Sequence, residues 1–281
     1  MGEKVLVVGL GEVGSAIYDI IKDAGHFELY GYDIDPEKTV NTLDEIPKID
    51  FLHICVPFKE TKQFVSIVKY YAERYDPGVI IIHSTVAPRT TREIYQALHV
   101  PTAFSPVRGK HPFLKQHIMF WPKWTCVLPR EYSSIVANHL SSLGLKVKIY
   151  NGEPETLELA KIFETVYRAL LIAWWQEMHR IARHFNADFI AITEFIGEIH
   201  EKLKDKPPMF PGFIGGHCLI PNTEILNKVY KSKFLDAILE SNAKRAKELE
   251  DPSVKEEVEK LKELVKRYIK KEYYEGGTVN Q

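Results

Sequence analysis

The first half of the chain alternates short β-branched apolar runs with stretches whose apolar residues recur at helical spacing. The apolar runs predict strands at residues 5–8, 28–32, 51–56, 79–83, 102–104 and 125–128, with a last run near 146–150. Nearly continuous apolar strands that alternate with helices are typical of a parallel sheet covered on both faces. We therefore predict an α/β fold in which residues 1–150 form a Rossmann-type, doubly wound parallel sheet.

A long helical pattern follows over residues 155–185. Such a helix is about 45 Å long at 1.5 Å per residue. Its apolar residues go nearly all the way round, which indicates burial on more than one side. We predict an all-helical dimerisation and catalytic domain at 151–250, with further helices at 188–203 and 223–250, and a homodimer formed through the long helix. The highly charged residues 251–281 predict a solvated helical tail.

The composition argues against several classes of function. The chain has 281 residues, 45% hydrophobic and 27% charged, as in an ordinary soluble globular protein. A formal net charge of -1 without a basic stripe gives no support to nucleic-acid binding, and the apolar runs are too short to span a membrane. Three widely spaced cysteines, and an N-terminus that reads as a strand rather than a signal peptide, favour a reducing, cytoplasmic location. No metal site is predicted.

A glycine-rich turn links the first predicted strand to a helix. Its glycines are Gly9, Gly11 and Gly14, and Asp33 ends the next strand about 20 residues further on, as a dinucleotide-binding fold requires. Gly9 permits the turn, Gly11 lets a pyrophosphate approach the backbone, and Gly14 lets the helix pack on the sheet. The carboxylate of Asp33 would accept hydrogen bonds from a ribose and repel a 2′-phosphate, which favours NAD over NADP. A tight turn in a nucleotide-free domain is the alternative.

Two further strand ends lie where the crevice of such a sheet opens, namely Cys55-Val56-Pro57 and His83-Ser84-Thr85-Val86. Pro57 and Thr85 are candidates for the nicotinamide side of the site. Ordinary strand termination explains either of them equally well. The predicted NAD-binding residues are Gly9, Leu10, Gly11, Glu12, Val13, Gly14, Asp33, Lys38, Val56, Pro57, Ser84 and Thr85.

A loop that follows a predicted strand carries two cations and a histidine within four residues, namely Arg108, Lys110 and His111. Such a cluster suits a carboxylate or phosphate on a small-molecule substrate, and Arg108 is able to bind it bidentately. Ordinary surface charge on a loop is an equally good interpretation.

The stretch 210–222 places Cys218 in a glycine-rich loop ahead of a predicted helix. Asn222 and Thr223 are good N-cap residues, and the positive end of that helix would favour the thiolate of Cys218. The glycines of the loop let the backbone approach a ligand closely. A buried structural cysteine beside a turn is the alternative.

Lys161, Thr165 and Arg168 are spaced to share one face of the long helix. A lysine on an apolar helix is usually a surface residue with a snorkelling side chain. Lys161 is a catalytic candidate if that face points toward a nucleotide site, and the sequence leaves this open.

Together these residues resemble the UDP-glucose/GDP-mannose dehydrogenase family, and roughly the first 240 residues match its NAD-binding and central dimerisation domains. The segments that carry the resemblance are Gly9-Leu10-Gly11-Glu12-Val13-Gly14, Gly31-Tyr32-Asp33-Ile34-Asp35, Ser84-Thr85-Val86, Glu158-Leu159-Ala160-Lys161, Gln176-Glu177 and Gly212-Phe213-Ile214-Gly215-Gly216-His217-Cys218. The resemblance implies oxidation of a sugar alcohol to a carboxylate with two NAD. It implies that Cys218 adds to an aldehyde intermediate and then carries a thioester, and that Lys161 stabilises an oxyanion.

The resemblance also assigns the remaining site residues. The catalytic set it implies is Cys218, Lys161, Thr165 and Asn222. The substrate-binding set combines the cationic loop with neighbours of the cysteine and lysine, namely Arg108, Lys110, His111, Arg168, Gly215, Gly216 and His217.

Three positions depart from the family's pattern. The family usually has asparagine where this chain has Thr165, aspartate where it has Asn222, and glutamate where it has Val107. An amide cannot act as a general base, so the hydrolysis of a thioester is either altered or supported by another group. The family's C-terminal domain, which binds the nucleotide part of the substrate, has no counterpart within the 281 residues.

Three hypotheses follow for the function. The first is an NAD-dependent dehydrogenase that oxidises an alcohol of an anionic, sugar-like substrate, with continuation to the acid through a Cys218 thioester left open. The second is a two-electron hydroxy-acid dehydrogenase in which Lys161 is the base, and the third is a non-catalytic NAD(H)-binding sensor or scaffold. The sequence decides neither the substrate, nor whether another subunit supplies the missing domain, nor the role of residues 251–281.

Overall fold

The computed structural model describes residues 2–268, and the chain divides into two compact units, Met1–Lys161 and Ile162–Gln281. We refer to them as unit 1 and unit 2 and describe each by itself. The prediction placed the division at residue 150, whereas the units divide inside the long helix. The reason is that the first turns of this helix pack on unit 1, where Leu157 belongs to the hydrophobic core.

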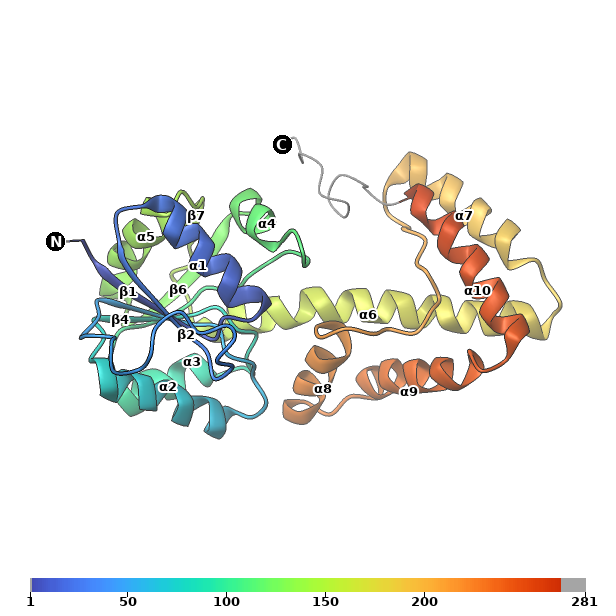
Figure 1. The fold of residues 1–281 in the computed structure, drawn as a ribbon. Helices are drawn as coiled ribbons and strands as arrows, with labels where there is room; N and C mark the ends of the chain where they lie inside the picture. Colours follow the sequence, from blue (N-terminus) through green and yellow to red (C-terminus); the bar gives the residue numbers. More distant parts are fainter. Residues whose placement is uncertain (1, 269–281) are drawn as a thin grey trace. The chain divides into compact units, whose positions relative to one another are not determined.

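Within the described residues, unit 1 is built on a seven-stranded sheet with the strand order β2-β1-β3-β4-β5-β6-β7 (Figure 1). The strands are β1 (Lys4–Val8), β2 (Glu28–Tyr32), β3 (Phe51–Ile54), β4 (Val79–Ile82), β5 (Thr102–Phe104), β6 (Lys123–Leu128) and β7 (Val147–Ile149). The helices of this unit are α1 (Glu12–Ala24), α2 (Thr61–Tyr75), α3 (Thr90–Leu98), α4 (Leu114–Phe120) and α5 (Ser133–Ser142). The doubly wound α/β prediction is confirmed.

Alternate residues of each central strand enter two separate cores, as the two-residue period of a strand requires. Val5 and Val7 of β1 pack with α1, α4 and α5 on one face of the sheet. Leu6 and Val8 pack with α2 and α3 on the other face, so that helices cover both sides (Figure 1). This burial on both faces is the reason that the strands read as continuous apolar runs.

The direction of β6 differs from the predicted all-parallel sheet. Strands β1 to β5 pair in parallel, β6 pairs with β5 in the antiparallel direction, and β7 is parallel to β6. An apolar run reads the same in either chain direction, so the sequence pattern could not show this reversal. One consequence is that Lys123, the first residue of β6, lies at the same edge of the sheet as the end of β5.

Unit 2 consists of helices. They are α6 (Pro154–His184), which begins in unit 1, and α7 (Phe189–Leu203), α8 (Leu219–Val229), α9 (Lys233–Glu248) and α10 (Pro252–Val265). Part of its core is formed by Trp175, Ala182, Phe189 and Leu261, which join α6, α7 and α10.

The helix predicted over 223–250 is two helices. The chain turns at Tyr230 to Ser232, where the Ser232 hydroxyl caps α9 by accepting a hydrogen bond from the Phe234 amide at 3.3 Å. The side-chain amide of Asn227 donates to Asp236 at 2.8 Å and ties the two helices together. Polar residues at these positions satisfy helix ends, so the break has a local chemical cause.

The described part of the predicted solvated tail is packed rather than solvated. Helix α10 buries Val254, Val258, Leu261 and Leu264, and it contacts α7. These residues recur at helical spacing, so the charged residues between them form the outer face of an amphipathic helix. Residues 269–281 of the predicted tail lie outside the described residues.

Candidate active site

The glycine turn of unit 1 has the geometry that a dinucleotide-binding loop needs. Gly9 adopts a φ of +86°, and a Cβ at this position would lie 2.9 Å from the backbone of Cys55 and Val56. A Cβ on Gly14 would lie 1.6 Å from the Gly9 oxygen, so α1 can approach the turn only because residue 14 is glycine. A Cβ on Gly11 would have no neighbour within 4 Å, which leaves open space beside the first turn of α1.

Asp33 lies beside this turn. Its Oδ2 accepts a hydrogen bond from the Leu10 amide at 2.6 Å, and its Oδ1 accepts one from the Asp35 amide at 2.9 Å. Thr39 fixes the backbone of Asp33 by accepting from its amide and donating to its oxygen. The structure thus brings the predicted carboxylate to the predicted glycine turn, and each oxygen retains a lone pair for a further donor.

The other predicted cofactor residues lie at the same edge of the sheet or on the surface near it. Ser84, after β4, donates from its hydroxyl to the Val56 oxygen, after β3, at 2.6 Å and so joins two neighbouring strand ends. Pro57 is exposed and Thr85 is half-buried. Lys38 pairs with Asp35 at 2.6 Å, and this contact, led by its hydrogen bond, raises the pKa of Lys38.

The three candidate side chains of the predicted anion-binding loop lie in different surroundings. Arg108 donates to the Pro122 oxygen at 2.6 Å and lies over the ring of Trp121, with the guanidinium carbon 5.0 Å from the ring centre. Lys110 and His111 are exposed. The amide of Lys110 donates to the buried His117 ring at 3.0 Å, so the loop backbone is anchored on α4.

Lys161 stands at the end of a strongly anchored segment of α6. One turn before it, the fully buried Glu158 accepts hydrogen bonds from the Arg89 amide at 2.7 Å and from the Thr91 amide and hydroxyl at 2.8 and 2.7 Å. Loss of solvation raises the pKa of Glu158, although these three donors oppose the shift. Glu158 therefore caps α3 and fixes the first turns of α6, a positioning role that the residue pattern did not reveal.

Cys218 is exposed and immediately precedes α8, as its N-cap residue. The helix begins at Leu219, four residues earlier than predicted, so Asn222 and Thr223 lie inside its first turns instead of capping it. Pro221 occupies the third helical position, where its missing N–H costs no intrahelical hydrogen bond. The earlier start places the thiol directly at the positive end of the helix. Gly215, Gly216 and His217 are exposed beside it.

Buried amide side chains hold the glycine-rich loop. Gln176 of α6 donates from its side chain to the Gly212 oxygen at 2.7 Å. Asn242 of α9 accepts from the Ile214 amide at 2.7 Å and donates to the Ile214 oxygen at 3.1 Å. In the sequence, Gln176 carries only part of the resemblance and Asn242 carries none, although a polar residue on an apolar helix face is a signal for such a role.

Two of the residues that depart from the family's pattern contact each other. Asn222 of α8 donates from its side-chain amide to the hydroxyl of Thr165 on α6 at 2.9 Å. Thr165 donates in turn to the Ile162 oxygen at 2.8 Å, and both side chains are buried. A hydrogen bond between these two residues therefore joins the helix of Lys161 to the helix of Cys218. Arg168, one turn further along α6, is half-buried.

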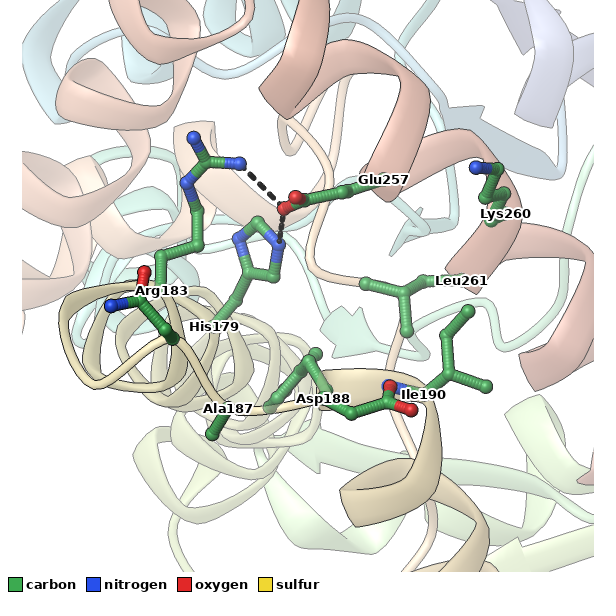
Figure 2. A pocket seen from close by; sticks show the side chains of 10 residues that line it. His179, Arg183, Ala187, Asp188, Ile190, Glu257, Lys260 and Leu261 are labelled. Carbon is green, nitrogen blue, oxygen red and sulfur yellow. Dashed lines mark hydrogen bonds and ion pairs between the residues drawn. The ribbon is translucent and has the colours of Figure 1, made fainter.

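A cavity of about 400 Å3 occurs elsewhere in unit 2, between α6, α7 and α10. Figure 2 shows that Arg183 and His179 of α6 both point to Glu257 of α10, at 2.6 and 3.1 Å. Asp188 at its rim caps α7. Three of the side chains that line it are thus engaged with one another, and no predicted site residue lines it. Among residues 2–268, no three His, Cys, Asp or Glu side chains are placed to hold a metal ion together.

A glycine turn with its acidic partner, on a doubly wound sheet followed by a helical unit, is an arrangement typical of dinucleotide-binding dehydrogenases. Residues 155–246 match the central domain of the UDP-glucose/GDP-mannose dehydrogenase family. This match confirms the resemblance to that family and the prediction of a dehydrogenase-type protein.

Known relatives agree with this result. The UDP-N-acetyl-D-mannosamine dehydrogenase of Methanocaldococcus jannaschii is 25% identical, over 96% of this chain and 70% of the relative. The structure of a UDP-D-ManNAc dehydrogenase from Pyrococcus horikoshii matches 86% of this chain and 68% of its own, with a TM-score of 0.75 and 18% identity. A 3-hydroxyisobutyrate dehydrogenase from Mycobacterium tuberculosis shares the fold with a TM-score of 0.62 and 14% identity, over 89% of this chain and 95% of its own.

The chain spans 65 to 70% of the length of three curated UDP-N-acetyl-D-mannosamine dehydrogenases that it matches. Within residues 2–268, no helix is both long and apolar enough to cross a bilayer.

Proposed function

We propose that this chain is an NAD-dependent dehydrogenase that oxidises an alcohol group of an anionic, sugar-like substrate. The observation that supports this best is the exposed thiol of Cys218 at the start of α8, in a loop that buried amides of α6 and α9 hold. The whole arrangement lies inside the segment that matches the family's central domain. A cysteine with a purely structural role is normally buried, whereas Cys218 is exposed in an anchored glycine loop.

NAD is the proposed cofactor because the residues of unit 1 fit it. The space beside Gly11 and the amides of the first turn of α1 suit a pyrophosphate, and the carboxylate of Asp33 suits the ribose hydroxyls. Bound NAD would supply the hydride acceptor. The chain's own contribution is to hold the substrate and to manage charge and protons around the reacting carbon.

The proposed chemistry has a first oxidation step and one further step. The alcohol loses a hydride to the cofactor and a proton to a base, and an ammonium group at Lys161 would stabilise the negative charge on oxygen. In the further step, the thiolate of Cys218 adds to the aldehyde, a second hydride would pass to a second NAD, and water hydrolyses the resulting thioester to the acid and the free thiol. Arg108, Lys110 and Arg168 are the proposed partners of the anionic part of the substrate.

A second candidate stops after the first hydride transfer. It is favoured by the contact between Asn222 and Thr165, because both side chains are buried and Asn222 carries no carboxylate with which to activate water. Val107, at the other position where the family has a carboxylate, is also buried. In this candidate Lys161 is the base and Cys218 lines the pocket.

Product stoichiometry separates the candidates. The purified chain is offered NAD with UDP-N-acetylmannosamine, UDP-glucose, sugar phosphates and hydroxy acids, and NADH is counted per substrate consumed. Two NADH per substrate, lost in Cys218→Ser, support the thioester route, and one NADH that Cys218→Ser leaves intact supports the second candidate. Cys126→Ser is the matched control, since the buried Cys126 donates to the Gly152 oxygen and serine preserves that bond. NAD binding without turnover across the panel would instead favour a sensor.

We further propose that a second copy of the chain covers α6. Its exposed apolar side chains recur every three, four or seven residues, with exposures from 37% for Leu170 to 72% for Phe185. The stripe consists of Phe163, Tyr167, Leu170, Trp174, Ile181 and Phe185. A long apolar stripe on one helix is the pattern by which two helices pack in parallel or antiparallel pairs. Sedimentation velocity tests this: a dimer is expected, and a monomer at micromolar concentration would contradict it.

A further inference from the structure

Four buried side chains form an unbroken line of nitrogen atoms through the interior of unit 1. His139 Nε2 lies 2.9 Å from His53 Nε2, His53 Nδ1 lies 2.9 Å from His83 Nε2, and His83 Nδ1 lies 3.1 Å from Lys123 Nζ. None of the four side chains is more than 3% exposed. They come from α5, β3, the end of β4 and the start of β6, so the line follows the sheet face that α5 covers.

The two ends of the line lie at opposite edges of the sheet. Lys123 donates to the Ser105 oxygen at 2.6 Å and the Pro106 oxygen at 3.0 Å, beyond the carboxyl end of β5. His139 stacks on Phe51 at the start of β3, and its Nδ1 lies 3.5 Å from Glu3, just before β1. Glu3 lines a hollow of about 670 Å3 at that amino edge, so this end reaches solvent.

When Lys123 is an ammonium, one protonation pattern satisfies every hydrogen bond of the line between Lys123 and His139. Its three protons go to the Ser105 oxygen, the Pro106 oxygen and His83 Nδ1. His83 then donates from Nε2 to His53 Nδ1, and His53 donates from Nε2 to His139 Nε2. His139 carries its proton on Nδ1 and directs it toward the Glu3 carboxylate, directly or through a water.

A second pattern satisfies the same contacts after one proton has moved from end to end. Lys123 gives a proton to His83 Nδ1, which now donates to the Ser105 oxygen at 2.9 Å. His83 Nε2 gives its proton to His53 Nδ1, and His53 Nε2 gives its proton to His139 Nε2. His139 Nδ1 releases its proton to Glu3 or water. Lys123 has become a neutral amine, each histidine is still neutral, and one proton has left at the amino edge.

We propose that His83, His53 and His139 form a proton relay that connects Lys123, at the carboxyl edge of the sheet, with solvent at Glu3 on the opposite edge. A second proton in the same direction requires the rings to turn. The parallel stacking of His139 on Phe51, with ring centres 3.7 Å apart, opposes such a turn. The relay therefore carries one proton out and one back, and it couples the charge of Lys123 to the tautomers of all three histidines.

The electrostatic surroundings favour these neutral-histidine patterns. Burial, reinforced by neighbouring cations, holds the pKa of His53 and His83 well below the usual range, and burial lowers the pKa of His139 to about 3. Burial also lowers the pKa of Lys123 to about 7. The groups that act on Lys123 are Cys55, which opposes the shift, and Lys161 and Arg108, which reinforce it; His26 and Glu3 are close to His139.

The proximity of Lys123 to Lys161 and Arg108 gives the relay a use. Each oxidation of an alcohol by NAD releases one proton, and a neutral Lys123, on which the charge of Lys161 acts, is able to take up a proton that the relay then discharges. This use rests on the proposed dehydrogenase activity. The relay itself does not, because its tautomers are measurable without turnover.

The decisive measurement is the tautomer of each ring as a function of pH in the full-length protein. Two-bond 1H–15N correlation spectra of 15N-labelled protein distinguish a proton on Nδ1 from one on Nε2. Between about pH 5.5 and about pH 8.5, on either side of the Lys123 pKa, His83 and His53 are expected to change from Nε2–H to Nδ1–H. His139 is expected to change from Nδ1–H to Nε2–H, with the same midpoint as the Lys123 amine.

His117 is an internal control. Its Nδ1 accepts a hydrogen bond from the Lys110 amide, so the neutral ring carries its proton on Nε2, and a contact outside the line sets this tautomer. Fixed tautomers of the other three rings, or midpoints that differ from that of Lys123, would overturn the relay even if the enzyme turns over. These outcomes require only the wild-type protein.

Two variants test whether the proton path between Lys123 and His139 runs through His53. Lys123→Met removes the proton donor and is expected to leave all three tautomers independent of pH. His53→Phe cuts the line at its centre, so that His83 should still follow Lys123 while His139 should not. If His139 still follows Lys123 in His53→Phe, the proton has another path and the proposal is wrong.

Discussion

Replacing Lys123 by methionine probes the energetic cost of a lysine buried in the sheet. The side chain is 3% exposed, and the loss of solvation lowers its pKa from 10.5 to about 7. The difference, 10.5 less about 7, is about 3.5 pKa units. At about 1.36 kcal/mol per unit, this corresponds to about 5 kcal/mol between the charged and the neutral form.

The sign of the pH dependence follows from which state binds more protons. Between pH 7 and pH 10.5, the unfolded chain keeps Lys123 protonated while the folded chain releases the proton. The free energy of unfolding of the wild type should therefore rise with pH across this window, by up to about 5 kcal/mol more than that of Lys123→Met. Below about pH 7 the cost of the buried charge is fully present in the wild type, and toward pH 10.5 it disappears.

Urea denaturation of both proteins at several pH values between 6 and about 10.5 is the assay, and the quantity of interest is the difference between their unfolding free energies. Methionine also leaves the Ser105 and Pro106 oxygens without their donor, but this loss is the same at every pH. Lys115→Met is the matched control, because Lys115 pairs with Asp23 at the surface of the same unit. A difference for Lys123→Met that does not change with pH would refute the reasoning.

Three further predictions concern the loop, the glycine turn and α6. Asn242→Leu strands the buried Ile214 amide and should lower the free energy of unfolding by about 1–3 kcal/mol in urea titrations. Gly11→Ala should leave the melting temperature unchanged but weaken NAD binding at least tenfold by calorimetry, whereas Gly14→Ala should disturb the fold itself, because its Cβ meets the turn at 1.6 Å. Trp174→Glu places a charge on the exposed stripe of α6 and should shift sedimentation from dimer to monomer; an unchanged dimer would exclude this face.

Several parts of the fold were predictable because each is encoded locally. Continuous apolar runs identified the strands of unit 1. Spacing alone identified the glycine turn and Asp33, which the structure joins through the Leu10 amide at 2.6 Å. The reversed direction of β6 was not predictable, since an apolar run carries no direction. The division of 223–250 into two helices depends on Ser232 as a cap, a signal that a helical pattern easily obscures.

The histidine line shows a different limit of sequence reasoning. His53 and His83 lie within apolar strand runs, and a polar residue there signals a buried partner. The partners lie 30 and 86 positions from His53 in the chain, so no local pattern could pair them. The contact between Thr165 and Asn222, 57 positions apart, was hidden for the same reason.

The sequence by itself determined the elements and the residue types of the candidate site, because periodicity, glycines and a cysteine loop are properties of short segments. Only the tertiary structure decided which side chains meet, and whether each is solvated. Only the folded chain therefore reveals that Cys218 is exposed and that Asn222 and Thr165 form a buried pair. It alone also shows that burial lowers the pKa of Lys123 to about 7. Solvation and long-range contact set the chemistry of these groups, and both are properties of the packed chain rather than of any segment in it.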